Sequence, residues 1–221
     1  MPPVFSIVIW DMDGVLIDSE RYWADEDFFF LRRAVHDWEQ VDEALFVGRS
    51  IDGMYELLTN QYQLQMDYQE YCEHYDQVAK RVYMEKAALM PHAYEVLTSL
   101  KERHIQQILV SSSPHKWIEF AMDRFRLKTF FDTIISADDV GGRGKPHPDI
   151  YQYTREQLNQ PISAIIAIED SSAGVEAAHG AGLTVVGFQP EESTQDLQQA
   201  DGLIQDLRPV VRIVDCGIPD R

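Results

Sequence analysis

The chain has 221 residues, enough for one large domain or two small ones with an adequate apolar core. Asp and Glu outnumber Lys and Arg by 37 to 19, which gives a formal net charge of -18 at pH 7. A charge of this sign repels nucleic acid and anionic membrane surfaces, so we expect neither as a partner. It would also repel an anionic ligand, unless a metal ion or a well-placed cationic side chain overcomes the field locally.

The cysteines and the short apolar segments indicate a protein of a reducing compartment. Cys72 and Cys216 are the only cysteines, and they are far apart and lack metal-ligand spacing, so we expect two free thiols. No basic region precedes the first apolar run, and no apolar stretch approaches the ~18 residues of a membrane span. We therefore expect a cytoplasmic protein without a membrane anchor, present as a monomer or a weak homodimer.

The first predicted element is a buried strand that runs directly into two carboxylates. Residues 5–10 are almost entirely apolar, and Asp11-Met12-Asp13-Gly14 follows at once. In an open α/β sheet, ligands bind at the carboxyl ends of the strands. If strand geometry continues, Asp11 and Asp13 point the same way, which two like charges tolerate when a cation lies between them or when one is protonated. A simple Asp-Gly turn is the alternative interpretation.

Residues 18–88 differ in character from the rest of the chain, because they contain no buried strand run. Helical patterns cover residues 22–38, 54–62 and 68–86. We therefore predict an all-helical insertion after the first strand. The predicted domains are a discontinuous α/β core of residues 1–16 and 90–221, and a helical domain of residues 17–89.

From about Met90 onward, helical and strand patterns alternate at short intervals. Predicted helices begin near Pro91, Trp117, Pro148 and Ser171. Predicted strands cover residues 108–110, 133–136, 164–168 and 184–188. Apolar runs that alternate with helices of this length indicate a parallel, doubly wound sheet. The predicted fold class is thus α/β, a Rossmann-like doubly wound core with an inserted helical domain.

Polar residues follow four of the predicted strands. They are Asp11 and Asp13 after the first, Ser111 to Ser113 after the second, Lys145 after the third, and Glu169-Asp170 after the fourth. Because the carboxyl ends of parallel strands share one edge of a sheet, we expect these side chains to lie together. Acids, hydroxyls and one ammonium suit phosphoryl transfer, which depends on positioning and on the neutralisation of anionic oxygens.

Each of these acids has a predicted role in such a reaction. Asp11 would attack phosphorus and form an aspartyl phosphate. Asp13 would protonate the leaving alkoxide and then take a proton from the attacking water. Mg²⁺ prefers oxygen ligands and is the expected cofactor. Its predicted ligands are Asp11, the backbone carbonyl of Asp13, Asp170, and Glu169 either directly or through water.

The serines and the lysine are predicted phosphate ligands. Ser111 lies where a strand gives way to a helix, and the free N–H groups and dipole of a helix N-terminus bind phosphate. Ser112 is a further candidate. Lys145 adds a positive charge that would hold the phosphate and keep Asp11 ionised. The alternatives are that these serines only cap the helix, with Ser113 as its N-cap, and that Lys145 belongs to a plain surface loop.

The order of these motifs resembles the haloacid dehalogenase superfamily of hydrolases. The motifs are Asp-x-Asp-Gly-Val, a strand-end Ser, Gly-Lys-Pro-x-Pro-Asp and Glu-Asp-Ser-x-x-Gly, and the resemblance covers essentially the whole chain. It implies the subgroup of small-phosphate-ester phosphatases and β-phosphoglucomutase, with residues 17–89 as a helical cap. It also implies Asp11 as nucleophile, Asp13 as acid and base, Ser111 and Lys145 as phosphate ligands, and Asp170 with Glu169 as metal ligands.

Trp23 distinguishes the two nearest relatives in this subgroup. The mutase has a cap histidine twelve residues after the nucleophile, and here Trp23 occupies that position. An indole cannot move protons between sugar hydroxyls at neutral pH, so a phosphatase is favoured over a mutase. This preference would weaken if His36 or His74 reached the site.

Three residues of the helical insertion are candidate substrate ligands. Arg49 lies in a Gly-Arg-Ser segment that resembles the substrate-specificity loop of the subgroup, although a plain surface arginine is the alternative. Glu20 and Trp23 are one turn apart at the start of the insertion, and they either face the cleft or pack the hinge.

We therefore predict a Mg²⁺-dependent phosphomonoester hydrolase that acts on a small phosphorylated metabolite, such as a sugar phosphate, through an aspartyl phosphate. A sugar phosphomutase of the β-phosphoglucomutase type is the first alternative, and a non-catalytic protein that binds phosphorylated metabolites is the second. A dehalogenase is disfavoured, because that chemistry would not need Asp13, Glu169 and Asp170.

Overall fold

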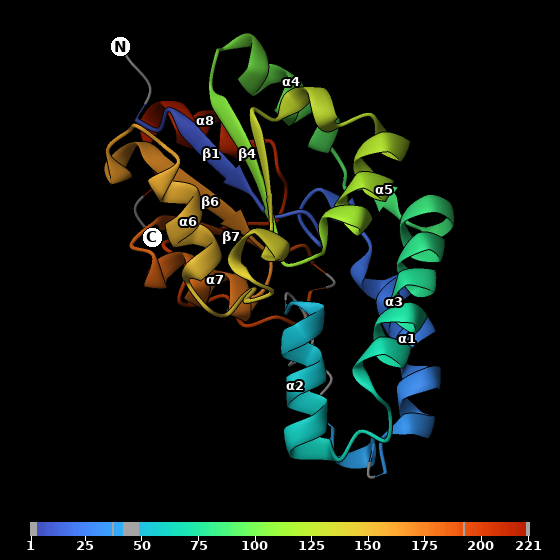
Figure 1. Ribbon diagram of the computed structural model, residues 1–221. Coiled ribbons are helices and arrows are strands. Elements are labelled where there is room, and N and C mark those ends of the chain that lie inside the picture. Colours follow the sequence, from blue (N-terminus) through green and yellow to red (C-terminus); the bar gives the residue numbers. More distant parts are fainter. Residues whose placement is uncertain (1–3, 37, 42–48, 192, 220–221) are drawn as a thin grey trace.

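The computed structural model has a layered α/β part, from one edge of which a set of long helices extends (Figure 1). It describes residues 4–36, 38–41, 49–191 and 193–219, except for the side chains of residues 24–30 and 40. Within these residues, no helix combines the length and the apolar character needed to cross a membrane.

The layered part is built on a sheet of six strands. In sheet order they are β5 (Thr133–Ser136), β4 (Gln106–Ser111), β1 (Ile7–Trp10), β6 (Ile165–Glu169), β7 (Thr184–Phe188) and β8 (Gly202–Ile204). All neighbouring pairs are parallel. The chain winds outward from β1 to β5 and then returns to β6 on the other side of β1. The topological switch point, where ligands bind in such sheets, therefore lies between β1 and β6.

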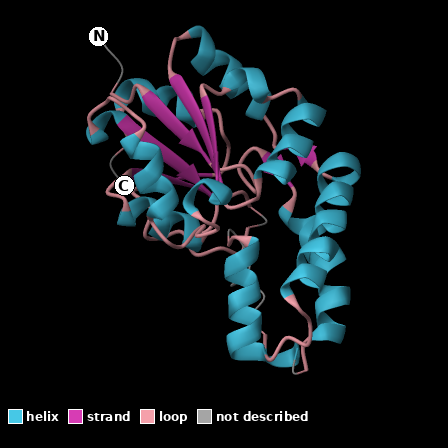
Figure 2. Cartoon of the chain, viewed as in Figure 1, coloured by secondary structure: helices cyan, strands magenta, loops and turns pink. Residues whose placement is uncertain are grey.

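Helices cover both faces of the sheet (Figures 1 and 2). One face carries α4 (Ala93–Glu102), α5 (His115–Phe125) and α8 (Pro209–Cys216), and the other carries α6 (Asp149–Glu156) and α7 (Ser172–Gly180). Val8 and Trp10 of β1 pack with the first set, while Ile7 and Ile9 pack with the second. Because both faces are covered, the strand is apolar at every position. Short 3₁₀ turns cover Lys128–Phe130, Ala137–Val140 and Ile162–Ala164.

The long helices lie between β1 and β4 in the chain. They are α1 (Glu20–Ala34), α2 (Ile51–Tyr62) and α3 (Tyr68–Arg81), with a 3₁₀ turn at Trp38–Gln40 and a π-helical turn, Val82–Lys86, after α3. A short antiparallel ribbon of β2 (Ile17–Asp18) and β3 (Ala88–Leu89) joins the start and the end of this region. We call residues 19–87, between the two ribbon strands, the helical segment.

The observed fold is the predicted one, a doubly wound parallel sheet with helices inserted after the first strand. All the predicted strands occur, but β8, α8 and the β2–β3 ribbon were not predicted. The predicted helix over residues 22–38 is too long, since α1 ends at Ala34 and Val35 is extended. The division into domains stays a prediction, and the ribbon strands lie at its proposed boundaries.

Candidate active site

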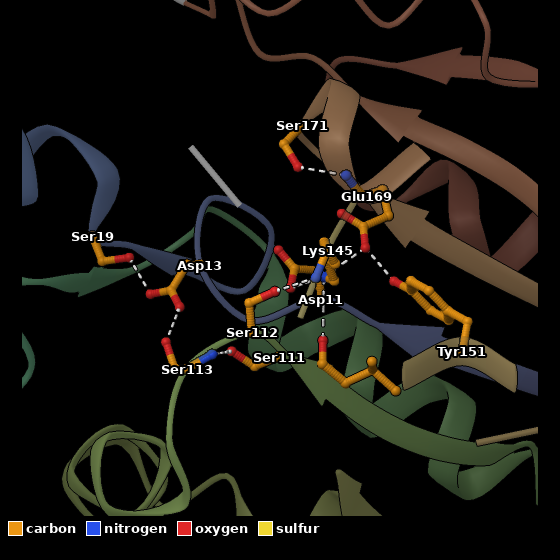
Figure 3. Close-up of polar contacts among 12 residues, drawn as sticks. Asp11, Asp13, Ser19, Ser111, Ser112, Ser113, Lys145, Tyr151, Glu169 and Ser171 are labelled. Atoms are coloured by element: carbon orange, nitrogen blue, oxygen red, sulfur yellow. Dashed lines mark hydrogen bonds and ion pairs between the residues drawn. The ribbon is translucent and has the colours of Figure 1, made fainter. Parts of the chain in front are cut away.

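Three acidic residues, Asp11, Glu169 and Asp170, lie at the carboxyl edge of the sheet, around the switch point. Figure 3 shows two of them, Asp11 and Glu169. Asp11 directly follows β1, and its N–H donates to the carbonyl oxygen of Ile168 in β6 (3.1 Å). Glu169 is the last residue of β6, and Asp170 comes next. All three acids are buried. The pairing of β1 with β6 therefore brings acids that are far apart in sequence to one place.

Lys145 connects the acids of β1 and β6. It is 2% exposed, and its Nζ lies 2.5 Å from Asp11 Oδ1 and 2.6 Å from Glu169 Oε1. Its backbone N–H donates to Ser112 Oγ (3.1 Å), which ties the loop after β5 to the residue after β4. Burial alone would lower the pKa of Lys145, but the charges of Asp11 and Glu169 raise it above its ordinary value. The ammonium therefore stays protonated at neutral pH.

Glu169 is held through one of its two carboxylate oxygens. Its Oε1 accepts hydrogen bonds from Lys145 Nζ and from the hydroxyl of Tyr151, a buried residue of α6. Its Oε2 has no hydrogen-bond partner among the described residues, and it lies where a Cβ on Gly174 would be only 1.9 Å away. One buried oxygen is thus left for a further ligand. Tyr151 was not among the predicted site residues.

Asp170 lies against the turn that follows β1. Gly14 in this turn has a φ of +75°, and a Cβ there would be 1.8 Å from Asp170 Oδ2. The left-handed backbone favours glycine, and the close approach of the carboxylate excludes any side chain. The Asp-Gly pair therefore serves the site, because its glycine allows Asp170, the residue after β6, to reach the turn that follows β1.

Asp11, Glu169 and Asp170 could together hold a metal ion. Each offers an oxygen atom, and these atoms lie within 4.8 Å of one another. Three buried carboxylates against one ammonium leave an excess of negative charge, which a divalent cation would offset. The all-oxygen donor set and the unpartnered Glu169 Oε2 fit Mg²⁺. Among the described residues, the side chain of Asp13 is not part of this group, so its predicted ligand, the backbone carbonyl, stays a prediction.

Burial governs the protonation of these three acids. It raises the pKa of Asp11, although the charge and the hydrogen bond of Lys145 oppose the rise. It also raises the pKa of Asp170 well above its ordinary value, and the charge of Asp11 adds to this rise. The pKa of Glu169 rises to about 7, again mainly through burial. A cation bound by these acids would favour their ionised forms, so metal binding at this site should release protons.

The hydrogen-bond partners of Asp13 differ from those of Asp11, although only one residue separates the two. β1 ends before both residues, so strand geometry does not apply, and Figure 3 shows the Asp13 carboxylate directed toward Ser19 and Ser113. Its Oδ1 accepts hydrogen bonds from Ser19 Oγ (2.6 Å) and from the hydroxyl of Tyr83 (2.7 Å), and its Oδ2 accepts one from Ser113 Oγ (3.2 Å). The two carboxylates therefore have separate hydrogen-bond partners, and the expectation that they point the same way stays a prediction.

This environment prepares Asp13 to exchange a proton near neutral pH. Burial raises its pKa to about 6, the charge of Asp11 adds to the rise, and the three hydroxyls oppose it. A general acid or base works best when its pKa lies near the working pH. Sequence reasoning missed Ser19 and Tyr83. The only signal for Tyr83 was an aromatic residue in a helical pattern, which is typical of core packing.

Ser111 and Ser112 lie at the end of β4, beside the lysine, as predicted. Both are buried. Ser111 Oγ accepts the N–H of Ser113 (3.1 Å), and Ser112 Oγ accepts that of Lys145 (3.1 Å). The structure thus brings the Ser112 hydroxyl to the backbone of Lys145, with Ser111 next to it in the chain, and contact of either hydroxyl with a phosphate stays a prediction.

The start of α5 differs from its prediction. Pro114 occupies the N-cap position without a side-chain cap, so Ser113 is not the N-cap and instead binds Asp13. The first N–H of the helix, that of His115, donates to the Asp138 carboxylate (2.9 Å) and is not free. At least one N–H group at the start of α5 is therefore not available to the predicted phosphate.

Comparison with known proteins supports the same chemistry. The family model for haloacid dehalogenase-like hydrolases matches residues 8–188. The chain belongs to the haloacid dehalogenase superfamily. It is therefore an enzyme of the hydrolase class, as its motifs predicted.

Relatives of this haloacid dehalogenase hydrolase match it over most of its length. Validoxylamine A 7'-phosphate phosphatase of Streptomyces hygroscopicus subsp. limoneus is 29% identical over 208 residues, covering 94% of this chain and 96% of that protein. A phosphorylated carbohydrates phosphatase of Thermotoga maritima is 31% identical over 181 residues, covering 80% of this chain and 81% of that protein. The structure of CbbY from Rhodobacter sphaeroides in complex with phosphate shares the fold, with a TM-score of 0.75, 21% identity, and coverage of 96% of this chain and 97% of that one.

In this haloacid dehalogenase hydrolase, Trp23 packs at the junction between the helical segment and α5. Its ring centroid lies 6.2 Å from that of Tyr75, 5.8 Å from that of Tyr83 and 5.3 Å from that of Trp117. These contacts favour packing over the cleft-facing alternative. Glu20, the first residue of α1, lies close enough for its charge to raise the pKa of Asp170, after burial and Asp11.

Arg49 lines a groove between α2 and the loop of residues 141–147. The groove has a volume of about 660 Å³, and Lys145 lines it as well. Its other polar side chains include Asp52, Glu56, Asn60, Gln61 and Arg143. The structure therefore brings Arg49 and Lys145 to one groove, and contact of Arg49 with a substrate stays a prediction.

Among the described residues, the hydrogen bonds that the Asp13 carboxylate accepts from side chains come from the hydroxyls of Ser19, Tyr83 and Ser113. His36 is exposed at the end of α1. His74 in α3 packs edge-on against Tyr75, with their ring centroids 6.0 Å apart.

Proposed function

We propose that this haloacid dehalogenase hydrolase is a Mg²⁺-dependent phosphatase that cleaves a small phosphorylated metabolite, such as a sugar phosphate. The observation that carries this proposal is the buried Asp11–Lys145 pair beside Asp13, whose pKa is about 6. A nucleophile, a cation for the phosphoryl oxygens and a proton donor are the groups that this reaction needs. Two relatives with phosphatase names support the proposal.

The proposed reaction has two steps. First, Asp11 attacks phosphorus and the bond to the ester oxygen breaks, while protonated Asp13 gives its proton to the leaving alkoxide. Second, ionised Asp13 takes a proton from water, which attacks phosphorus and releases inorganic phosphate and free Asp11. With a pKa of about 6, Asp13 can hold the proton in one step and release it in the other.

Lys145 has two proposed tasks. Its ammonium would bind a phosphoryl oxygen, together with Ser111 and Ser112. It would also reduce the repulsion between Asp11 and an anionic substrate, which matters in a chain with a formal net charge of -18. Its burial between two carboxylates keeps it charged for both tasks.

The proposed cofactor is Mg²⁺, held by Asp11, Asp170 and the backbone carbonyl of Asp13, with Glu169 acting directly or through water. When bound, it would neutralise charge on the phosphoryl oxygens. The buried oxygen cluster and the unpartnered oxygen of Glu169 support this assignment.

We further propose that residues 17–89 form a cap that covers the substrate and excludes bulk water. Arg49 and Glu20 are its proposed substrate ligands. The polar groove at Arg49 suits a hydroxyl-rich leaving group, and the name of one relative, a phosphorylated carbohydrates phosphatase, supports a sugar phosphate. The free Cys72 and Cys216 support a cytoplasmic location.

A phosphomutase is the weaker candidate. It would need a proton carrier for sugar hydroxyls at position 23, where a tryptophan packs among aromatic rings. We therefore propose that the phosphoryl group on Asp11 passes to water.

A phosphate-release assay over a panel of phosphorylated metabolites, with Mg²⁺ or with EDTA, tests this function. We expect release of inorganic phosphate in Mg²⁺ and none in EDTA. With a hexose 1-phosphate, the expected products are the free sugar and phosphate, whereas formation of the 6-phosphate would identify a mutase. Ligand-induced thermal shifts without turnover of any compound would instead indicate a non-catalytic binding protein.

A further inference from the structure

The amino end of α2 is docked on the loop of residues 141–147, which carries Lys145 (Figure 1). Ser50, the N-cap residue of α2, donates from its Oγ to the carbonyl oxygen of Gly142 (2.9 Å). The same Oγ accepts the N–H of Gly53 (3.1 Å). Ser50 is only 3% exposed. One buried hydroxyl therefore both caps the helix and binds the loop.

Two glycines of this loop make the close approach of α2 possible. Gly142 has a φ of +80°, and a Cβ there would lie 1.8 Å from Asp52 Oδ2. A Cβ on Gly144 would lie 2.7 Å from Ser50 Cβ and 2.8 Å from Ser112 Oγ. Contacts below 3 Å are not available to a real side chain without movement of its neighbours. The fit between helix and loop thus depends on the absence of a side chain at Gly144, whereas a side chain at Gly142 would force the Asp52 carboxylate to turn away.

The contact continues into the candidate phosphate ligands. The N–H of Gly144 donates to the carbonyl oxygen of Gly142 (2.9 Å), the atom that also accepts from Ser50. Lys145 comes next, with its N–H on Ser112 Oγ and its Nζ on Asp11. A displacement of Gly142 would therefore reach the ammonium through a few bonded and hydrogen-bonded groups.

We propose that Ser50 is a positioning residue that holds the loop of residues 141–147, against which Asp52 packs, and thereby keeps Lys145 in contact with Asp11. The helical segment then controls phosphate binding through the backbone of this loop, in addition to covering the site. The kinetic consequence rests on the proposed phosphatase function, whereas the effect on the loop does not.

Two adjacent glycines provide a matched test. Gly141 also has a positive φ, +67°, but apart from its chain neighbours no described residue lies within 4 Å of a Cβ at this position. Gly141→Ala and Gly142→Ala therefore introduce similar backbone strain, and only the second meets Asp52. Removing the carboxylate in the double variant Asp52→Ala/Gly142→Ala leaves Asp52 Cβ, at 3.6 Å, as the nearest atom of that residue. The proposal requires the double variant to recover what Gly142→Ala loses.

Hydrogen–deuterium exchange of the peptide that spans residues 141–147 measures how well the loop amides are protected, and it needs no substrate. We expect faster exchange in Gly142→Ala than in Gly141→Ala, and slower exchange again in the double variant. With a phosphate ester, Gly142→Ala should lose on the order of ten- to a hundredfold in kcat/KM, and Gly141→Ala less than about threefold. The inhibition constant of inorganic phosphate should rise by a similar factor as kcat/KM falls.

A second pair of variants separates the loop contact from helix capping. Asp67 caps α3 through the N–H of Glu70 (2.9 Å) and is exposed. Ser50→Ala and Asp67→Ala each remove one N-cap, but only Ser50→Ala should speed exchange in residues 141–147. Equal exchange in the two glycine variants, no recovery in the double variant, or equal effects of the two cap variants would overturn the proposal. If the wild-type protein hydrolyses no ester, the exchange results still decide it.

Discussion

Only one residue separates Asp11 from Asp13, yet Asp11 is held by a charged side chain and Asp13 by hydroxyl groups. Lys145 Nζ lies 2.5 Å from Asp11, whereas Asp13 accepts three hydrogen bonds from uncharged side chains. Burial raises the pKa of both acids, but Lys145 opposes the rise at Asp11, while the charge of Asp11 adds to it at Asp13. The ammonium side of the site thus favours an ionised carboxylate, and the hydroxyl side favours one that can change its protonation state.

Replacing each aspartate by asparagine is the strongest way to break this comparison. Asp11→Asn should lower kcat at least about a thousandfold, because the nucleophile is lost while the fold is kept. In Asp13→Asn, Asp11 should still attack the phosphorus of an ester whose leaving group needs no proton, such as p-nitrophenyl phosphate. Without a base for water, this variant should then accumulate phosphorylated protein. Intact-protein mass spectrometry would detect this.

The control in that experiment is the Asp11→Asn protein under the same conditions, which should carry no phosphoryl group. Phosphorylation of Asp11→Asn, or its turnover at the wild-type rate, would contradict the assignment of Asp11 as the nucleophile. Equal loss without phosphorylation in both variants would show that the two acids act as one unit.

Removal of the Lys145 ammonium should lower both the stability and the activity of the protein. Lys145→Met leaves buried carboxylates without their partner, and we expect the free energy of unfolding to fall by about 3 kcal/mol. The matched control is Lys116→Met. Lys116 Nζ lies 2.6 Å from Asp76, but those side chains are 59% and 40% exposed, against 1% and 6% for Lys145 and Asp11. We expect less than about 1 kcal/mol there.

Urea denaturation in EDTA measures both losses, and the assay measures kcat/KM, which should fall at least about a hundredfold only in Lys145→Met. If the two variants lost equal stability, burial would not be what distinguishes the two ion pairs.

Much of the ammonium side could be predicted from the sequence. Asp11 and Glu169 each follow an apolar run, and the rule that ligands bind at strand ends places them together. The hydroxyl side could not be predicted in this way. Tyr83 reaches Asp13 across 70 residues of chain, and it does so from a π-helical turn that no pattern indicated. A tyrosine in a helical pattern is more simply explained by packing.

The edge strand β8 could not be predicted from the sequence either. β8 has only three residues, of which Leu203 is exposed, so it gives neither the length nor the continuous apolar run that revealed the inner strands. The close approach of Asp52 to Gly142 also leaves no trace in a pattern search, whereas Gly14 stands out in the sequence as part of the Asp-x-Asp-Gly-Val motif.

Tyr151→Phe should weaken only the binding of Mg²⁺ at the candidate site. It removes the hydroxyl that donates to Glu169 and keeps the ring in the core. Groups that hold metal ligands in place typically contribute ten- to a hundredfold to metal affinity, and we expect about a tenfold weaker Kd for Mg²⁺. Isothermal titration calorimetry with Mg²⁺ measures this without turnover. Tyr83→Phe is the matched control and should leave the Kd unchanged. Equal weakening in both would show that the two sides of the site are not independent.

Tyr83→Phe should have the smallest effect and should act on Asp13 through its pH dependence. The Tyr83 hydroxyl donates to Asp13 Oδ1, which favours the ionised form and opposes the rise of the Asp13 pKa to about 6. Without the hydroxyl this pKa should rise further. In the proposed mechanism Asp13 is protonated when it acts on the leaving group, so kcat/KM should fall as the pH rises through its pKa. In Tyr83→Phe this fall should move to higher pH. At any single pH the change should stay below about tenfold. Tyr151→Phe, assayed at saturating Mg²⁺, should keep the wild-type profile. A shift to lower pH in Tyr83→Phe would mean that the hydroxyl does not stabilise the ionised carboxylate, and that Asp13 is not the group whose titration limits the first step.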